Sequence, residues 1–355
     1  MDLEFQITQN NADFYDWLLN DINRAQKSIC IETFIYINDE IGRKIREALT
    51  QKALEGLKVF VLVDSAGSFN LPNNFFAPLA AAGGEIKFFR SFKFFFRFLE
   101  KINHRDHQKL FIIDNEITYI SSANIMEKSL EWRELTIRIR NASEGAAFSR
   151  IFRENFEIAD SHRIDGKLTH HIHTPAFDIL RDIPLHLKTP VREKTFKLIE
   201  NAREEIYLET PYLINDWSMR KRLNEAKRRG VRITIVGPLK ADYWVVDILN
   251  KKYMAKFLKM GIDVRMFTSR FLHSKLLIVD GGVFMTGSSN WDYRGFLIQF
   301  ELMIMGNCPP LLHALKDHAR QSVEGSRPFT DREHKRRSII QKLMGKLLIP
   351  IEKFF

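Results

Sequence analysis

The chain has 355 residues, of which 45% are hydrophobic, so it is long enough for two ordinary domains and apolar enough to give each a core. Its 54 basic against 44 acidic residues give a formal charge of +10, which favours a polyanionic partner such as anionic lipid headgroups or nucleic acid. Two cysteines, a start that does not resemble a secretory signal and no apolar run near the ~18 residues of a membrane span argue against a disulfide-rich secreted or integral membrane protein.

The predicted elements alternate between helix and strand. Phe14–Ala25 has helical periodicity, residues 28–37 form a buried strand, and a helix over Ile41–Glu55 ends at Gly56 before another strand. This order repeats later, where the helix Met219–Arg229 also ends at a glycine and leads into a strand. Alternating strands and helices predict a mainly parallel sheet flanked by helices in each half. We therefore expect an α/β fold of two duplicated lobes.

Two carboxylates strengthen the evidence for a repeat. Glu32 and Glu209 each lie in a predicted buried strand and are each followed by a Thr. A carboxylate among apolar residues needs a partner, so we expect one for each of them.

A phenylalanine-rich stretch follows in the first half, over residues 81–101. Its apolar residues fall at helical spacing and three cations, Arg90, Lys93 and Arg97, interrupt them; the apolar residues are Phe88, Phe89, Phe92, Phe95, Phe96 and Leu99. A core helix and a membrane-surface contact explain this pattern about equally well. After it, Trp132 and Arg133–Arg140 form the last predicted strand of the first half, and Phe148–Ile158 its closing helix.

The pattern loosens between residues 160 and 190, where four histidines gather: His162, His170, His171 and His173. Without Cys or a placed carboxylate, they are a weak metal signal, and an exposed linker is the better interpretation. We expect a first lobe over residues 1–160, a linker over 161–190 and a second lobe over 191–330.

Two features stand out in the second half. Tyr243 and Trp244 follow its second strand and could line an opening for acyl chains or pack in the core. Residues 331–355 read as a basic amphipathic helix with the apolar stripe Ile339, Ile340, Leu343, Met344, Leu347 and Leu348. An interfacial helix is favoured over one packed on the body.

The clearest functional signal is a duplicated motif, in which a His is followed by a Lys after two residues, an Asp after five more and an Asn after ten more. The copies are His107, Lys109, Asp114, Asn124 and His273, Lys275, Asp280, Asn290. Residues two apart on a strand share a face, so each copy presents an imidazole beside an ammonium. The Asp falls at a turn-like strand end, which favours a structural anchor. Two copies face to face would suit a phosphate.

This pattern resembles the phospholipase D superfamily, and the surrounding sequence resembles its bacterial cardiolipin synthases. The second copy matches completely, including Gly287 and Ser288, whereas the first has Ser121 in place of Gly. The resemblance implies a pocket between the lobes in which one His is the nucleophile, His107, and the other, His273, is the acid and base. It implies that the Lys and Asn residues stabilise the phosphate oxygens, that Glu134 and Glu301 hold the imidazoles, and that neither a cofactor nor a metal ion is needed.

Three functions compete on this evidence. The first is a phosphatidyltransferase that joins two phosphatidylglycerol molecules into cardiolipin at the cytoplasmic face of the inner membrane, as a peripheral protein with the whole site in one monomer. The second is a hydrolase of phospholipid or, less favoured, of nucleic acid. Nucleases of this superfamily often carry one motif per chain and dimerise, so the internal duplication argues against them. The third, a non-enzymatic lipid-surface adaptor, is disfavoured because all six polar motif residues are intact.

Overall fold

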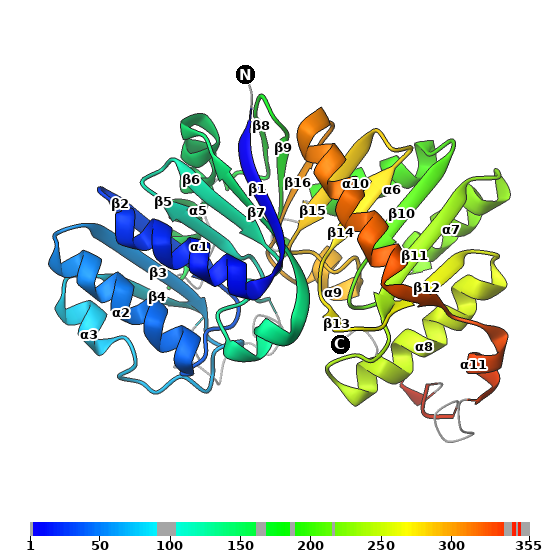
Figure 1. Ribbon diagram of the computed structural model, residues 1–355, viewed down its shortest axis with the longest axis horizontal. Helices are drawn as coiled ribbons and strands as arrows, with labels where there is room; N and C mark the ends of the chain where they lie inside the picture. The colour runs from blue at the N-terminus through cyan, green and yellow to red at the C-terminus, as the bar shows by residue number, and fades with distance from the viewer. Residues whose placement is uncertain are drawn as a thin grey trace.

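The computed structural model describes residues 3–90, 104–160, 168–184, 189–214, 217–336, 343–345 and 347–348. Within these ranges the chain forms two α/β lobes that stand side by side, each built around one sheet (Figure 1). Two duplicated lobes are therefore confirmed.

The first sheet has the strand order β1-β7-β6-β5-β2-β3-β4. Its strands are β1 (Glu4–Asn10), β2 (Ser28–Thr33), β3 (Lys58–Asp64), β4 (Glu85–Phe89), β5 (Leu110–Ile113), β6 (Ile117–Ser121) and β7 (Trp132–Arg140). Its helices are α1 (Asn11–Arg24), α2 (Glu40–Leu54), α3 (Ala77–Ala81), the 3-10 turn η2 (Glu127–Glu131) and α5 (Ala142–Ile158).

The second sheet has the order β17-β12-β11-β10-β14-β15-β16-β9-β8. Its strands are β8 (His171–His173), β9 (Asp178–Asp182), β10 (Glu205–Glu209), β11 (Arg232–Pro238), β12 (Asp263–Phe267), β14 (Leu276–Val279), β15 (Val283–Gly287), β16 (Glu301–Gly306) and β17 (Ser326–Pro328). The helices are α6 (Pro190–Asn201), α7 (Trp217–Arg228), α8 (Trp244–Lys259), α9 (Tyr293–Leu297), α10 (Pro309–Glu324) and α11 (Asp331–Arg336).

Both sheets are mixed, so the prediction of mainly parallel sheets is wrong. Only β2-β3-β4 and β10-β11-β12 pair in parallel within the two main strand paths, and the other neighbours are antiparallel. The reason is local: each motif is a hairpin, β5–β6 or β14–β15, inserted beside the first parallel strand. Three residues join the strands of each hairpin, and the first two of them, Asp114 and Asn115 or Asp280 and Gly281, take positive φ in a tight turn.

Three apolar clusters place the helices relative to the sheets. One packs α1, α2 and α3 on the outer face of the first sheet, and another packs α6, α7 and α8 on the outer face of the second. The central cluster takes side chains from both sheets and from α5 and α10. Because this core is shared, burial of apolar surface holds the lobes together as well as each lobe.

The predicted linker is partly strand. Residues 171–173 and 178–182 form β8 and β9, which extend the second sheet beyond β16. The linker prediction is therefore wrong for these residues. Their runs are too short to show a strand period in sequence, and pairing with β16 decides their conformation. His162 lies outside the described residues.

Two membrane-contact predictions change in part. Phe88 and Phe89 lie in β4 rather than in a helix, because β4 pairs with β3. The other members of the phenylalanine-rich stretch lie outside the described residues: Phe92, Lys93, Phe95, Phe96, Arg97 and Leu99.

In the C-terminal stripe, Leu343 and Leu347 are exposed whereas Leu348 packs into the core of the second lobe, so the stripe is not one exposed face. Ile339 and Ile340 lie outside the described residues. No helix in the described ranges is long and apolar enough to cross a membrane.

Candidate active site

The segment before each motif hairpin crosses into the other lobe. Leu272 of β13 (Phe271–Leu272) pairs with Arg133 of β7, and Asp106 pairs with Phe300 beside β16. As a result, the amide of His273 donates to the carbonyl of Arg133 at 2.8 Å, and that of His107 donates to the carbonyl of Phe300 at 3.0 Å. Each histidine backbone is thus fixed by the opposite lobe.

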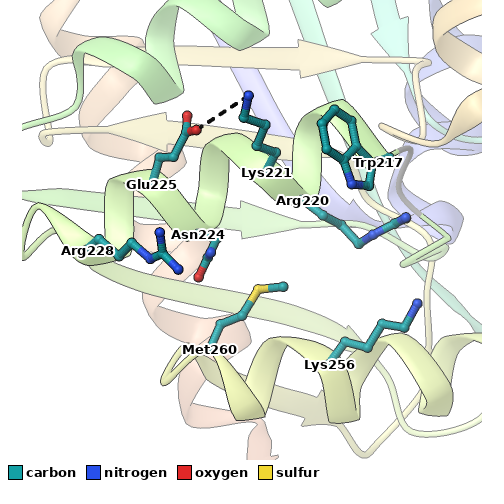
Figure 2. Close-up of a pocket in the computed structure, with 8 residues that line it drawn as sticks. All are labelled: Trp217, Arg220, Lys221, Asn224, Glu225, Arg228, Lys256 and Met260. Atoms are coloured by element: carbon teal, nitrogen blue, oxygen red, sulfur yellow. Dashed lines mark ion pairs between the residues drawn. The ribbon is translucent and has the colours of Figure 1, made fainter.

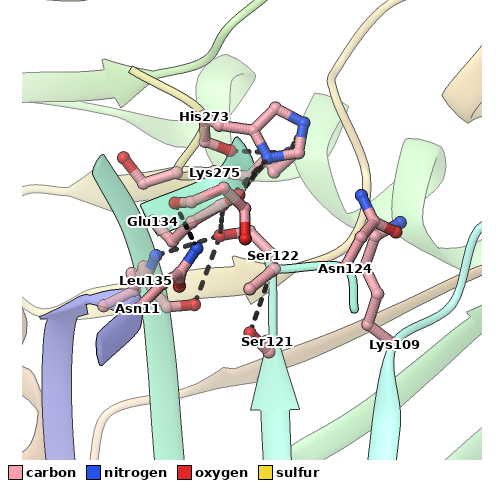
Figure 3. A network of polar contacts seen from close by, with 12 residues as sticks. Asn11, Lys109, Ser121, Ser122, Asn124, Glu134, Leu135, His273 and Lys275 are labelled. Atoms are coloured by element: carbon pink, nitrogen blue, oxygen red, sulfur yellow. Dashed lines mark hydrogen bonds and ion pairs between the residues drawn. The ribbon is translucent and has the colours of Figure 1, made fainter. Parts of the chain in front are cut away.

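Each of the two imidazoles also takes its carboxylate partner from the opposite lobe. Nδ1 of His273 lies 2.8 Å from both carboxylate oxygens of Glu134, which reaches it from β7 of the first lobe (Figure 3). Nδ1 of His107 lies 3.0 Å from Oε1 of Glu301, which comes from β16 of the second lobe. Because Nδ1 of each ring is engaged, Nε2 is the nitrogen left to meet a phosphorus atom.

Two serines orient these carboxylates, and the sequence analysis gave them no role. Ser122 donates its hydroxyl to Glu134, and Ser288 donates to Glu301. Both sit two residues before the motif Asn, and this matching position in the two copies was the signal that could have identified them.

The two motif lysines turn back towards their own histidines. Nζ of Lys109 donates to the carbonyl of His107, and Nζ of Lys275 to that of His273, each at 2.6 Å. Nζ of Lys275 also lies 3.1 Å from Nε2 of His273, so an oxygen bound by this ammonium would sit beside that nitrogen. Burial lowers the pKa of Lys109 to about 8 and that of Lys275 to about 7.

The motif asparagines end the hairpins inside the same buried region. Oδ1 of Asn124 accepts a hydrogen bond from the amide of Ile35 at 3.1 Å. The hydroxyls of Tyr15 and Thr210 donate to the carbonyls of Asn124 and Asn290, at 2.6 and 2.7 Å. Both asparagines are therefore buried and held in place through their backbone carbonyls.

The motif aspartates lie outside the pocket. Asp114 accepts from the amides of Gln26, Lys27 and Ser28, and Asp280 accepts from those of residues 203–205. They join each hairpin turn to the start of the neighbouring strand. This placement agrees with the anchor interpretation and contradicts a direct catalytic role for either residue.

The one departure between the motif copies has a structural explanation. Gly287 has φ of +150°, and a Cβ there would lie 2.2 Å from the carbonyl oxygen of Leu302, so only Gly fits. Ser121 occupies the matching position, where its hydroxyl lies 2.6 Å from that of Thr136. The first copy therefore accommodates a side chain that the second excludes.

Comparison with known proteins identifies the family to which the chain belongs. A family model described as "Cardiolipin synthase, PLD-like domain" matches residues 18–157 and 195–322, one match within each lobe. The chain belongs to this family of phospholipase D-like proteins. It is 30% identical to the major cardiolipin synthase ClsA of Bacillus subtilis, over 99% of this chain and 76% of that protein. It is 28% identical to a cardiolipin synthase of Listeria monocytogenes, again over 99% of this chain and 76% of the relative.

Solved structures support the fold. A phosphatidylserine synthase of Haemophilus influenzae superposes with a TM-score of 0.75 at 13% identity, covering 99% of this chain and 94% of that one. A polyphosphate kinase of Porphyromonas gingivalis gives a TM-score of 0.66 at 16% identity, covering 99% of this chain and 54% of that one. At these identities the likeness extends to the fold alone.

Within this family fold, the two histidine–carboxylate pairs are not equivalent. Burial lowers the pKa of His107 well below its usual range, and Lys109 and Lys275 lower it further. Burial also lowers the pKa of His273, but Glu134 opposes it. For the carboxylates, burial raises the pKa of Glu301, whereas that of Glu134 is lowered because His273 and Lys275 outweigh burial. Protonation is therefore disfavoured at both rings, and more strongly at His107 than at His273, where the Glu134 carboxylate opposes the effect of burial.

The two buried strand glutamates have the partners that the sequence analysis expected. Glu32 accepts from Nδ2 of Asn155 at 2.6 Å, and Glu209 accepts from Nε2 of His318 at 2.9 Å. Although burial raises it, His318 and Arg133 together lower the pKa of Glu209 to about 2. Glu209 also accepts from Ser274, the residue next to His273.

Two arginines that the sequence analysis did not single out link the lobes. Arg133 on β7 donates from Nε and Nη2 to the hydroxyl of Ser322 on α10, at 3.1 and 2.9 Å. Arg181 on β9 reaches the other way and donates to Glu154 on α5 at 2.6 Å. The exchange seen at the histidines thus continues through buried hydrogen bonds and one part-buried ion pair.

Two histidines of the predicted linker pair with one aspartate. His171 and His173 lie 3.1 and 2.8 Å from Asp178 across the β8–β9 hairpin. Among the described residues, no group of three or more His, Cys, Asp or Glu side chains has a geometry that could hold a metal ion.

Proposed function

We propose that this protein joins two phosphatidylglycerol molecules into cardiolipin and releases glycerol. The observation that carries the proposal is the pair of buried histidines with exchanged glutamates, in a chain whose relatives over nearly its full length are named cardiolipin synthases. Two imidazoles and two ammonium groups in one site suit a phosphodiester, whose charge they can bind while one ring attacks and the other transfers a proton.

In the proposed first step, Nε2 of His107 attacks phosphorus and the glycerol oxygen leaves with a proton from His273. The P–O bond breaks as the P–N bond forms, which gives a phosphatidyl-histidine. The low pKa of His107 supports the nucleophilic role, because the attacking ring has to be neutral. The carboxylate of Glu134 supports the acid role, because it stabilises the protonated ring of His273.

In the second step, His273 takes the proton from a hydroxyl of the second phosphatidylglycerol, and that oxygen attacks phosphorus. The P–N bond breaks, cardiolipin leaves and both rings return to their starting states. Lys109, Lys275, Asn124 and Asn290 would hold the non-bridging phosphate oxygens through both steps. We propose no resident cofactor.

Thin-layer analysis of purified protein with phosphatidylglycerol vesicles tests the proposal. Cardiolipin plus glycerol is the expected result. Phosphatidic acid plus glycerol would instead mean that water is the acceptor and that the enzyme is a hydrolase. A peripheral position at the cytoplasmic face of the inner membrane and a site complete in one monomer remain predictions; separating membrane and soluble fractions, and sedimentation of the active species, would test them.

The histidine roles have their own test. With a substrate that carries a good leaving group, wild-type protein quenched in denaturant at alkaline pH, where a phosphohistidine survives, should retain the phosphoryl group. The His107→Ala variant should trap none, and the His273→Ala variant should still trap it because departure of that group needs no proton. The opposite pattern would reverse the assignment.

A further inference from the structure

A groove of about 470 Å³ lies on the second lobe between α7 and α8, and none of its lining residues belongs to the motif (Figure 2). Four of its eight lining residues are cations: Arg220, Lys221, Arg228 and Lys256. Among the described lining residues, the one carboxylate belongs to Glu225, which lies 3.8 Å from Nζ of Lys221. The groove therefore carries net positive charge and suits an anionic ligand.

Aromatic rings order these cations. Nζ of Lys221 lies 5.4 Å from the ring centroid of Trp217. The guanidinium of Arg220 and Nζ of Lys256 lie 4.9 and 4.6 Å from the ring centroid of Tyr253, which is itself buried. Arg220 of α7 and Lys256 of α8 thus lie against the same buried ring, that of Tyr253. Because their positions are restricted beforehand, these side chains lose less conformational entropy when an anion binds.

The helices begin at the edge of the sheet that bears the catalytic motif. β10 and β11 are parallel, with Glu209 opposite Val236, so their carboxyl ends share one edge. β14 runs antiparallel to β10 and starts opposite Glu209, which places the preceding His273 at the same edge. Because α7 follows β10 and α8 follows β11, both helices start there, at Trp217 and Trp244.

Large exposed aromatic side chains mark this edge in both lobes. Trp217, Tyr243 and Trp244 are 66, 65 and 65% exposed. In the first lobe, Phe69 is 72% exposed in the loop after β3, the strand that matches β11, at the edge where His107 lies. Core packing, one of the two explanations for Tyr243 and Trp244, is therefore wrong. Exposed aromatic rings beside ordered cations are typical of a surface that meets the headgroup region of a bilayer.

We propose that the α7–α8 groove and the four exposed aromatic residues form a docking surface for an anionic bilayer, which brings the histidine pocket to its lipid substrate. The cations contact headgroup phosphates and the aromatic rings enter the interface. This inference rests on the proposed function, since a phospholipid substrate has to be drawn from a bilayer. It assigns the membrane contact to α7 and α8 of the second lobe and to Phe69 of the first lobe, rather than to the C-terminal stripe alone.

The test uses full-length protein and sedimentation with phosphatidylcholine vesicles, with and without phosphatidylglycerol. Each cation near an anionic surface strengthens binding about fivefold, so Arg220→Gln with Lys256→Gln should weaken binding to the phosphatidylglycerol vesicles roughly 30-fold. Trp217→Ala with Trp244→Ala should weaken binding to both vesicle types. The matched control is Lys27→Gln with Lys58→Gln, which removes the same charge from exposed residues at the opposite sheet edge and should change binding little.

Turnover of a short-chain, soluble phosphodiester separates this inference from the proposed function. The groove variants should keep wild-type turnover of that substrate and a wild-type unfolding midpoint. If the groove and control variants bind vesicles equally well, the docking surface is refuted while the proposed function stands. If the groove variants lose binding to an oligonucleotide but not to vesicles, the groove serves nucleic acid instead and the inference also fails. If wild-type protein binds vesicles but makes neither cardiolipin nor phosphatidic acid, the proposed function fails and the surface stands.

Discussion

Replacing Glu134 by Gln tests the link between the exchanged carboxylates and the chemistry. Both carboxylate oxygens lie 2.8 Å from Nδ1 of His273, and the side chain is buried. Unit charges about 4 Å apart attract by about 4 kcal/mol at an effective dielectric of about 20, so losing the carboxylate destabilises the protonated ring by about that amount. At about 1.4 kcal/mol per factor of ten, turnover of phosphatidylglycerol should fall about 1,000-fold.

A substrate with a nitrophenolate leaving group should show which step is affected. Its departure needs no proton, so Glu134→Gln should still release one nitrophenolate per enzyme in a rapid burst. Transfer to an alcohol then needs His273 as a base, so steady turnover should stay slow. Glu301→Gln acts on the attacking ring of His107 and should abolish the burst as well. Stopped-flow absorbance measures both phases.

Glu131 supplies a matched control, because it is an exposed carboxylate three residues before Glu134 and its replacement by Gln should leave both phases unchanged. Equal unfolding midpoints for the three variants would exclude a folding defect. The reasoning is refuted if Glu301→Gln keeps the burst and Glu134→Gln loses it, or if neither substitution slows turnover of phosphatidylglycerol by more than about tenfold.

Three further outcomes follow from the site. Because the pKa values of Lys275 and Lys109 are lowered to about 7 and about 8, both ammonium groups lose charge as pH rises through that range, and KM for phosphatidylglycerol should rise. Lys275→Arg should move this rise in KM to higher pH. An unchanged KM profile in that variant would contradict the reasoning. Arg181→Leu leaves Glu154 and Asn155 on α5 without their cation and should lower the free energy of unfolding by about 3 kcal/mol in a denaturant titration. A loss below about 1 kcal/mol would argue that Arg181 does not link the lobes. Activity should survive EDTA, because side chains supply the positive charge; complete loss restored by a divalent ion would refute this.

The motif geometry could be predicted because its determinants are local. Strand alternation places His107 and Lys109 two residues apart on one face, and the Asp-Asn and Asp-Gly pairs fix tight turns. The exchange of glutamates could not be predicted in this way. Glu134 is 139 residues from His273 in sequence, and no local spacing indicates which histidine it serves.

The mixed sheets and the linker strands were missed for a related reason. The alternation of helix and strand describes only the parallel part of each sheet, whereas the motif hairpins and β7 or β16 add antiparallel strands that are separated only by tight turns, by the 3-10 turn η2 or by the five-residue helix α9. His171–His173 is a strand only because β9 lies beside it. In each case a tertiary pairing overrides a weak local preference.

The exchange between lobes explains why the two motifs act as one unit. Each histidine takes its backbone partner and its carboxylate from the opposite lobe, so a single lobe would leave its imidazole without either. Duplication within one chain also allows the halves to diverge, which two identical subunits could not do. His273 packs against the ring of Trp132 and contacts both oxygens of Glu134, whereas His107 packs against Phe34 and contacts one oxygen of Glu301. That divergence makes His273 the ring that is protonated more readily and His107 the ring that stays neutral, which matches the division between proton transfer and attack that the reaction requires.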